Sequence, residues 1–204
     1  MNNKYTIAAF DFDDTITKKC TFVDIIIYSK GLLNFLLGMS TLLPDVILYK
    51  MGFLSNYLVK KKMFTKFFAG QTIEDFKLLC NEYSTNKIDE MILTKAKNQI
   101  EWHKSKGHKL VIVTASIEDW IKPWAINNGF DDVLSTKVQI KNGILTGDFE
   151  NKNCYGKEKV RRFLEKYPDR SNYYLYAYGD SDGDKDLLRY ADESLYNYKK
   201  FNKK

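Results

Sequence analysis

Short apolar segments alternate with longer stretches of helical periodicity along this chain. Three short segments, 5–12, 109–114 and 173–178, are rich in β-branched and aromatic residues. Their length and composition predict buried strands. The helices expected beside them lie at 91–106, 117–128, 156–167 and 184–191. Strands that alternate with helices in this way predict an α/β fold with a doubly wound parallel sheet.

The first strand is separated from the rest of this pattern. Between Thr17 and about Thr94 we find no convincing strand, and the periodicity indicates helices at 22–30, 32–49, 54–68 and 73–83. We interpret this stretch as a helical insertion after the first strand rather than as an independent domain. The expected division is an α/β core of residues 1–17 and 95–204 with a helical unit of residues 18–94.

Further strand signals lie in the second half of the chain. Residues 138–140 and 144–146 flank Asn142-Gly143, a dipeptide that favours the tight turn of a β-hairpin. A last strand is expected at 194–198, before a lysine-rich end that we expect to fray.

Polar segments follow the three predicted strands. They are Asp11, Asp13, Asp14 and Thr15 after the first, Thr114, Ala115 and Ser116 after the second, and Asp180, Asp182 and Asp184 after the third. Ligands of open α/β sheets bind at these carboxyl ends of the strands. Carboxylates gathered there repel one another unless a cation or a shared proton is present. An all-oxygen set of this kind favours Mg²⁺, which also accepts substrate phosphate as a ligand.

Two of these carboxylates can divide the chemistry. In strand geometry Asp11 and Asp13 point the same way. One carboxylate can then attack phosphorus to form an aspartyl-phosphate, while the other moves protons. The pair therefore favours covalent catalysis at a phosphoryl group.

The order of these segments resembles the motifs of the haloacid dehalogenase superfamily. Asp11-Phe12-Asp13-Asp14-Thr15 is similar to its first motif, Thr114 to its second, a lysine near a helix start to its third, and Gly179-Asp180 with Asp184 to its fourth. Together these motifs frame nearly the whole chain. The helical insertion and the hairpin resemble the phosphoserine-phosphatase-like branch (subfamily IB). The resemblance implies a Rossmann-like core with a helical cap after the first motif.

The resemblance also implies roles for the acidic residues. Asp11 would be the nucleophile, and Asp13 would protonate the leaving alcohol and then deprotonate the attacking water. Mg²⁺ would be held by the Asp11 carboxylate, the Asp13 backbone carbonyl and Asp180.

The other motifs would bind and neutralise the phosphoryl group. Residues 114–116 would bind its oxygens, and Asp184 would hold a second metal position or orient the lysine. The family's spacing from Gly156 favours Lys159 as that lysine, and Lys157 is the runner-up. A lysine suits this role because it is a compact point charge.

Composition narrows the class of protein. The chain is 44% hydrophobic and 28% charged, which is typical of a globular protein. Its net charge of +6 predicts attraction to anionic partners. The three cysteines, at 20, 80 and 154, form no metal or disulfide pattern, so we expect free thiols in a reducing, cytoplasmic setting. His103 and His108 are expected to be solvated charges near a helix end.

An apolar stretch at 31–54 raises the question of a membrane. Residues 31–44 carry no charge, but fourteen residues are too few to span a bilayer. Lys30, Lys50 and the lysines at 60–62 flank the stretch. A buried helical hairpin is the default interpretation. The alternative is peripheral contact with the inner face of a membrane, which would suit a lipid phosphate as substrate.

The leading hypothesis for function is an Mg²⁺-dependent phosphatase acting on a small phosphometabolite or a lipid phosphate. The lipid alternative is similar to the phosphatidylglycerophosphate phosphatases. A phosphotransferase and a non-catalytic phosphate-binding module are further alternatives. Phosphoserine itself is in doubt, because Cys20 stands where phosphoserine phosphatases carry a glutamate. No nucleic-acid partner is expected, because the tyrosines at 173–178 fall on a predicted strand.

Overall fold

Five parallel strands form the central sheet of the computed structural model, which describes residues 4–196. Their order across the sheet is β3-β2-β1-β6-β7. The strands are β1 (Tyr5–Phe10), β2 (Lys109–Ile117), β3 (Asp132–Thr136), β6 (Tyr173–Gly179) and β7 (Glu193–Tyr196), and every neighbouring pair is parallel. The predicted doubly wound parallel sheet is confirmed. The end of the strand expected at 194–198 and the lysine-rich end lie outside the described residues.

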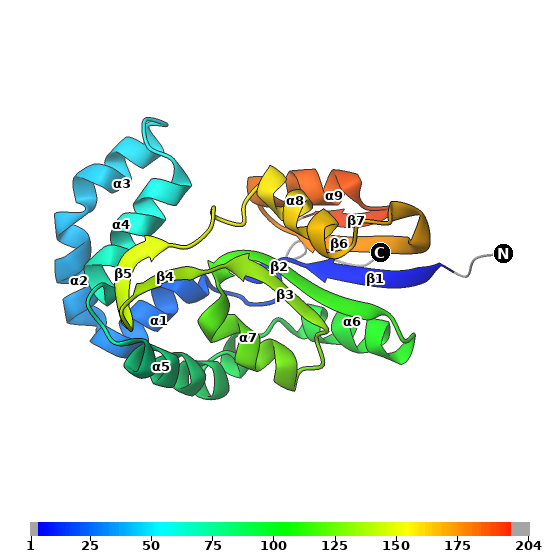
Figure 1. The fold of residues 1–204 in the computed structure, drawn as a ribbon, viewed down its shortest axis with the longest axis horizontal. Helices are drawn as coiled ribbons and strands as arrows, with labels where there is room; N and C mark the ends of the chain where they lie inside the picture. Colours follow the sequence, from blue (N-terminus) through cyan, green and yellow to red (C-terminus); the bar gives the residue numbers. More distant parts are fainter. Residues whose placement is uncertain (1–3, 197–204) are drawn as a thin grey trace.

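Helices cover both faces of this sheet. One face carries α6 (Thr94–Ser105) and α7 (Glu118–Asn127), and the other carries α8 (Lys157–Lys166) and α9 (Lys185–Tyr190) (Figure 1). Alternate residues of β1 enter two separate cores, Ala8 and Phe10 on one side and Ile7 and Ala9 on the other. Side chains of a strand alternate between faces, so residues 7–10 of β1 are buried on both sides and are all apolar.

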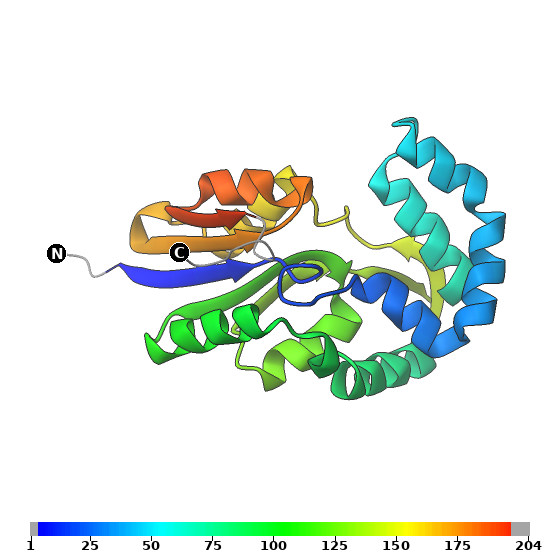
Figure 2. The same ribbon diagram turned by 180° about the vertical axis from the view of Figure 1, so that it is seen from behind.

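The insertion between β1 and β2 forms a lobe at one end of the sheet (Figures 1 and 2). Its helices are α1 (Thr21–Lys30), α2 (Leu32–Thr41), α3 (Leu43–Lys50), α4 (Asn56–Phe68) and α5 (Ile73–Asn86). The prediction of a single helix at 32–49 is therefore wrong. The helix is interrupted at Leu42, and Pro44 lies in the first turn of α3, where its missing N–H costs no helical hydrogen bond.

A β-hairpin from later in the chain packs on these inserted helices. It consists of β4 (Val138–Lys141) and β5 (Ile144–Phe149), joined at Asn142 and Gly143, which both have positive φ. Thr65 of α4 donates its hydroxyl to the Gly147 carbonyl over 2.8 Å. A Cβ at Gly147 would lie 2.9 Å from the Thr65 backbone, so only glycine allows this contact. The hairpin therefore packs on the lobe of inserted helices, although the expected division assigned residues 95–204 to the α/β core.

The remaining elements are short. Three-residue 3₁₀ helices lie at Asp89–Met91, Arg170–Asn172 and Asp182–Asp184. Within residues 4–196, no single helix has the length and apolar character needed to cross a bilayer. Only α1 and α2 taken together reach that length, and the pair bends by 116°.

The expectation for the histidines is wrong for His103. Its side chain is fully buried, and Nε2 lies 2.9 Å from the Tyr178 hydroxyl. Its Nδ1 lies 2.7 Å from Nδ1 of His108. Burial, with a smaller contribution from His108, lowers the pKa of His103 to about 4. His103 is therefore a neutral member of the core near neutral pH.

Candidate functional site

A cavity of about 370 Å³ lies where the carboxyl ends of β1, β2 and β6 face the inserted helices. Its polar lining includes Asp11, Asp13, Asp14, Thr114, Ala115, Lys159, Asp180 and Ser181. Three polar segments that are far apart in the sequence therefore meet at one edge of the sheet, as the strand order predicts.

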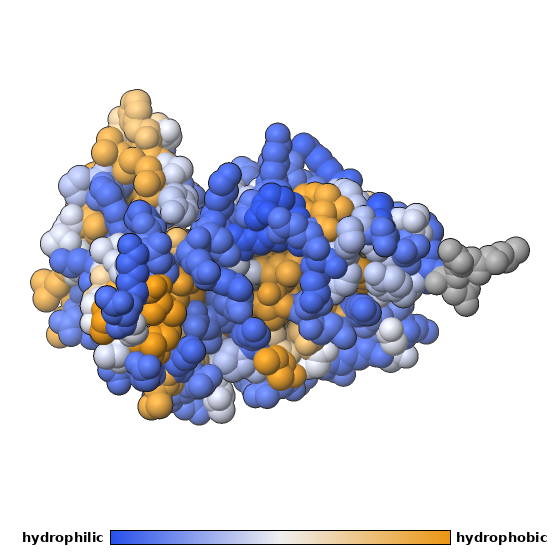
Figure 3. All heavy atoms as spheres, in the orientation of Figure 1, coloured by the Kyte–Doolittle hydropathy of each residue, from blue (hydrophilic) through white to orange (hydrophobic). Residues whose placement is uncertain are grey.

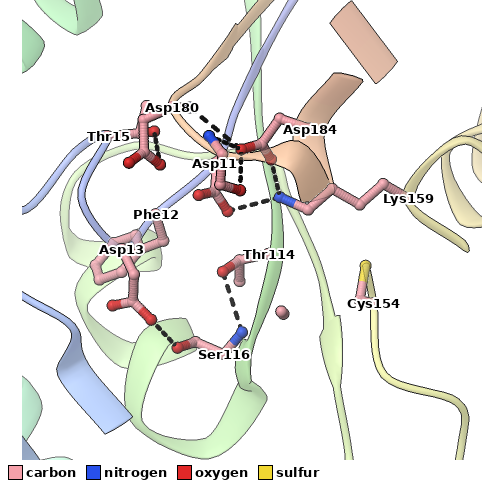
Figure 4. A network of polar contacts seen from close by, with 12 residues as sticks. Asp11, Phe12, Asp13, Thr15, Thr114, Ser116, Cys154, Lys159, Asp180 and Asp184 are labelled. Atoms are coloured by element: carbon pink, nitrogen blue, oxygen red, sulfur yellow. Dashed lines mark hydrogen bonds and ion pairs between the residues drawn. The ribbon is translucent and has the colours of Figure 1, made fainter. Parts of the chain in front are cut away.

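Lys159 joins two of these segments. Its ammonium lies 2.6 Å from Asp11 Oδ1 and 2.6 Å from Asp184 Oδ1, and its side chain is only 2% exposed (Figure 4). Burial alone would lower the pKa of Lys159, but the two facing carboxylates outweigh it and raise the pKa. Lys159 therefore stays charged. Lys157, the alternative considered from the sequence, is exposed on the first turn of α8.

Asp184 is held on both of its carboxylate oxygens. Oδ2 accepts hydrogen bonds from the Ser181 N–H (2.9 Å), the Ser181 hydroxyl (2.7 Å) and the Asp180 N–H (3.2 Å). The glycine at 179 makes this packing possible, because a Cβ there would lie 2.4 Å from the Asp184 Cβ. With Oδ1 on Lys159 and Oδ2 on the loop, Asp184 is placed to orient the lysine.

The surroundings of Asp11 disfavour its ionised form. Burial raises the pKa of Asp11 to about 7, although the Lys159 ammonium opposes the shift. The nearby carboxylates of Asp184 and Asp13 raise it further. A cation bound at Asp11 would favour the ionised carboxylate.

Three acidic residues could hold a metal ion. One carboxylate oxygen from each of Asp11, Asp180 and Asp184 lies within 4.8 Å of the others. Hard carboxylate oxygens at this spacing fit a small divalent cation such as Mg²⁺. The set overlaps the expected ligands at Asp11 and Asp180.

Asp13 points away from this cluster. Its Oδ1 accepts the N–H and the hydroxyl of Thr21, each over 2.7 Å, and its Oδ2 accepts a hydrogen bond from the Ser116 hydroxyl (Figure 4). The expectation that Asp11 and Asp13 point the same way is wrong, because β1 ends at Phe10 and the strand rule no longer applies. Both residues nevertheless line the same cavity.

The three residues of segment 114–116 do not all face the cavity. Thr114 and Ala115 line the cavity, whereas Ser116 lies behind it. The Ser116 N–H donates to Thr114 Oγ1 over 3.1 Å, and its hydroxyl donates to Asp13. Ser116 therefore supports Asp13 and Thr114 from behind the cavity. Its expected contact with phosphate stays a prediction.

Lys60 of α4 is a site residue that the sequence reasoning missed. Its ammonium donates to the Ala115 carbonyl and lies 5.2 Å from the ring centroid of Phe22, inside the cavity. Burial, opposed mainly by Asp13, lowers the pKa of Lys60 to about 8. The helical spacing contained the signal, because residue 60 falls on the same stripe as the buried Phe64 and Phe67.

The other lysines at 60–62 do not share this position. Lys61 pairs with Asp148 over 2.6 Å, and Lys62 pairs with Asp45 over 2.5 Å. The three consecutive lysines therefore have three different environments, because a helix turns about 100° per residue. Only Lys60 faces the cavity.

The wall opposite the carboxylates is largely apolar. The inserted helices contribute Phe22, Val23, Tyr49, Val59 and Met63 to it. Cys20, directly before α1, also lines the cavity, and all three cysteines are free thiols as expected. The site therefore has an anionic floor with two lysines and an apolar wall.

Comparison with known proteins places this site in context. The sequence pattern described as haloacid dehalogenase-like hydrolase matches residues 8–189. Protein CicA of Caulobacter vibrioides is 30% identical over 96% of this chain and 87% of its own length. A probable phosphatase of Mycobacterium tuberculosis is 26% identical over 90% of this chain and 65% of its own length.

Solved structures share the fold at lower sequence identity. A protein of unknown function from Bordetella pertussis has a TM-score of 0.81 at 18% identity, over 95% of this chain and 90% of its own. A phosphoserine phosphatase, solved as an analogue of its phospho-aspartyl intermediate, has a TM-score of 0.67 at 19% identity, over 95% and 87%.

Proposed function

Because this chain belongs to the haloacid dehalogenase-like hydrolase family, we propose that it is an Mg²⁺-dependent phosphatase with Asp11 as its nucleophile. The observation that carries the proposal is the buried Lys159 between Asp11 and Asp184, beside Asp180. This arrangement neutralises a nucleophilic carboxylate at the place where a phosphate would add further negative charge. The likeness to a probable phosphatase supports the same reaction.

In the first half-reaction, an Asp11 carboxylate oxygen attacks phosphorus. The new P–O bond to Asp11 forms as the P–O bond to the substrate alcohol breaks. The leaving oxygen takes a proton from Asp13, which must turn from Thr21 and Ser116 toward the cavity. Thr114 lines the cavity where its hydroxyl can donate to a phosphoryl oxygen.

In the second half-reaction, Asp13 takes a proton from water, and the water oxygen attacks phosphorus. The P–O bond to Asp11 breaks, so inorganic phosphate leaves and the Asp11 carboxylate is restored. Asp11 and Asp180, with the Asp13 backbone carbonyl, would hold Mg²⁺. When bound, the ion would supply positive charge that stabilises the phosphoryl oxygens. Lys159 supplies a fixed positive charge in both steps.

Two alternatives share parts of this chemistry. A phosphotransferase would use the same first half-reaction and pass the phosphoryl group to an alcohol instead of water. A non-catalytic phosphate-binding module would have no use for Asp13. The presence of Asp13 on the cavity wall favours an enzyme.

The cavity wall also bears on the substrate. Cys20 lines the cavity with a thiol, at the position where phosphoserine phosphatases carry the glutamate that contacts the substrate amine. Lys60 places a cation on the same side. We infer a phosphomonoester whose organic part is apolar or anionic, rather than one that carries an amine.

A lipid phosphate is the second candidate substrate. The observation that favours it is the apolar wall built by Phe22, Val59 and Met63 beside the phosphate site. Contact of residues 31–54 with the inner face of a membrane would bring such a substrate to the cavity. A small phosphometabolite with an apolar body would use the same wall.

The test is hydrolysis of an aryl phosphate with and without Mg²⁺. Turnover should require the metal, stop with a chelator and return when Mg²⁺ is added. Asp11→Asn should abolish turnover and leave the circular dichroism spectrum unchanged, while the exposed Asp169→Asn should behave as wild type. Full activity in chelator, or turnover by Asp11→Asn, would contradict the mechanism.

A substrate panel then separates the two candidates. It contains serine phosphate, sugar phosphates and glycerophospholipids with a terminal phosphomonoester. Preference for the lipid phosphates over every soluble ester would support the second candidate. The reverse preference would support a small phosphometabolite.

A further inference from the structure

Large apolar side chains lie exposed on the outside of the inserted helices. They come from α2, α3 and the loop that follows, and they are Leu32, Leu33, Leu36, Leu37, Leu43, Ile47, Leu48, Met51 and Phe53. Leu33 is 77% exposed and Phe53 is 73% exposed. We call these nine residues the outer apolar surface. Figure 3 shows part of it at the tip of the lobe, over α3 and its loop, on the side facing away from the sheet.

Helix α2 has apolar residues on all sides. Its inner side packs on the lobe through Phe35 and Met39, and Gly38 brings α2 close to the Phe67 ring. Leu33 and Leu37 lie one turn apart on its outer side. A helix on a water-exposed surface normally has a polar outer face. The leucines therefore indicate contact with an apolar partner.

The few polar side chains on α2 bond to nearby backbone carbonyls, at the end of α1 for Asn34 and within α2 for Ser40 and Thr41. Asn34 donates to the Lys30 carbonyl over 2.8 Å, Ser40 to the Leu37 carbonyl over 2.8 Å, and Thr41 to the Gly38 carbonyl over 2.7 Å. These bonds satisfy donors that would otherwise need water. A surface of this kind loses little hydrogen bonding when it enters an apolar phase.

Charges around the surface are almost all positive. Between Asp24 and Glu74 the chain has six lysines and one acidic residue, Asp45. Lys60 faces the cavity, Lys61 pairs with Asp148 and Lys62 pairs with Asp45, which leaves Lys30, Lys50 and Lys66. Lys30 and Lys66 line a shallow cleft of about 430 Å³ together with Leu37. In residues 4–196, neither Lys30 nor Lys66 forms an ion pair, so both are available to an anionic group.

We propose that the outer apolar surface docks on a bilayer that contains anionic lipids, with Lys30 and Lys66 binding lipid headgroups. Apolar side chains bordered by lysines match the boundary between acyl chains and anionic headgroups. A second copy of this chain fits less well, because a two-fold interface would bring the same lysines face to face.

Docking would also place the catalytic cavity near the bilayer. Tyr49 of α3 lines the cavity and is itself exposed, directly after Leu48 of the outer apolar surface. The docking surface and the cavity mouth therefore adjoin on one helix. Docking itself does not depend on hydrolysis, so the two proposals can fail separately.

The experiment is co-sedimentation of the full chain with vesicles of phosphatidylcholine alone or mixed with phosphatidylglycerol. The Asp11→Asn variant is used beside wild type, so that binding is measured without turnover. Both proteins should sediment with the anionic vesicles at low salt, and far less with phosphatidylcholine alone or at high salt.

Matched variants distinguish binding through the outer apolar surface from non-specific adsorption to the vesicles. Leu33→Glu with Phe53→Glu should weaken binding at least tenfold, whereas Leu78→Glu on α5, at a residue 72% exposed, should not. Lys30→Gln with Lys66→Gln should remove most of the salt sensitivity, and Lys77→Gln with Lys157→Gln should not. All of these side chains are exposed or half-buried, so folding should survive in each variant.

Two results would overturn the proposal. One is wild-type protein that stays in the supernatant of anionic vesicles at low salt. The other is an equal loss of vesicle binding in the Leu33→Glu, Phe53→Glu variant and in the Leu78→Glu variant. Dimerisation in analytical ultracentrifugation that Leu33→Glu abolishes, without vesicle binding, would assign the surface to a second copy instead.

Discussion

The Lys159 ammonium donates to the Asp11 carboxylate over 2.6 Å, with both side chains almost completely withdrawn from solvent. The same ammonium reaches Asp184 over 2.6 Å, so one cation balances two buried carboxylates. This relationship ties stability to catalysis. The charge that would activate the phosphoryl site is also the charge that makes the buried acids tolerable.

Lys159→Met should therefore damage both properties. Removing one partner of a buried ion pair leaves uncompensated charge and typically costs about 3–5 kcal/mol. We expect a lower free energy of unfolding in urea and loss of at least about 100-fold in turnover. Lys157→Met, at the exposed neighbouring lysine, should change neither quantity. Equal effects of the two substitutions would mean that the ion pair does not matter.

Asp13→Asn should slow hydrolysis by about 10²–10⁴-fold, the usual contribution of a general acid–base residue. The loss should be largest for alkyl phosphates, whose leaving alkoxide needs a proton. It should be smaller for nitrophenyl phosphate, whose leaving group is stable as an anion. The measurement is kcat for both esters with wild type and variant. An equal loss for the two esters would assign Asp13 to the support of Thr21 and Ser116 instead.

Lys60 should give the enzyme a pH dependence in substrate binding. Its pKa is lowered to about 8, so the ammonium predominates at neutral pH and is lost as pH rises above about 8. KM for the best substrate should then increase with pH over this range. Lys60→Gln should raise KM at neutral pH about tenfold, which corresponds to one charged hydrogen bond, and should flatten the pH profile.

The control for Lys60 is its neighbour Lys61, which is paired with Asp148 outside the cavity. Lys61→Gln should leave both KM and its pH profile as in wild type. A Lys60→Gln enzyme that keeps the wild-type rise in KM above about pH 8 would exclude Lys60 as its source.

His103 should make the fold sensitive to mild acid. Its pKa falls from 6.5 to about 4 on folding, so the unfolded chain binds the proton more tightly. Stability from the neutral ring is fully present above about pH 6.5 and is lost as pH falls toward about 4, by at most about 3 kcal/mol.

The measurement is urea unfolding of wild type and His103→Gln between about pH 7 and pH 4. The amide of the variant does not titrate, so its free energy of unfolding should fall less over this interval. Carboxylates contribute equally to both proteins, and only the difference reports His103. Parallel curves would show that His103 does not couple folding to pH.

The sequence by itself determined the sheet and the chemistry at its edge. Apolar strand segments such as 110–114 are buried on both faces, so their composition identifies them without knowledge of their neighbours. Asp11 and Asp180 directly follow such strands, and Thr114 lies near the end of another. Parallel strands bring these ends together in any arrangement that forms one sheet. Strand β3 was not predicted, because only two of its five residues are apolar and they give no continuous apolar signal.

Only the tertiary structure decided where individual side chains point. Lys60, Lys61 and Lys62 are equivalent as letters, but α4 turns one into the cavity and the other two toward Asp148 and Asp45. β1 ends at Phe10, so the alternation of a strand does not set the direction of the Asp13 side chain. Asp13 instead accepts a hydrogen bond from the Ser116 hydroxyl.

The apolar stretch at 31–54 shows the same limit. The sequence favours a buried hairpin for its leucines, and the exposure of Leu33 and Leu37 contradicts that expectation. Gly38 decides the orientation of α2, because its missing side chain lets the Phe67 ring approach and leaves Leu33 and Leu37 outside. Local preference fixes which element forms, whereas packing between distant residues fixes which of its faces meets solvent.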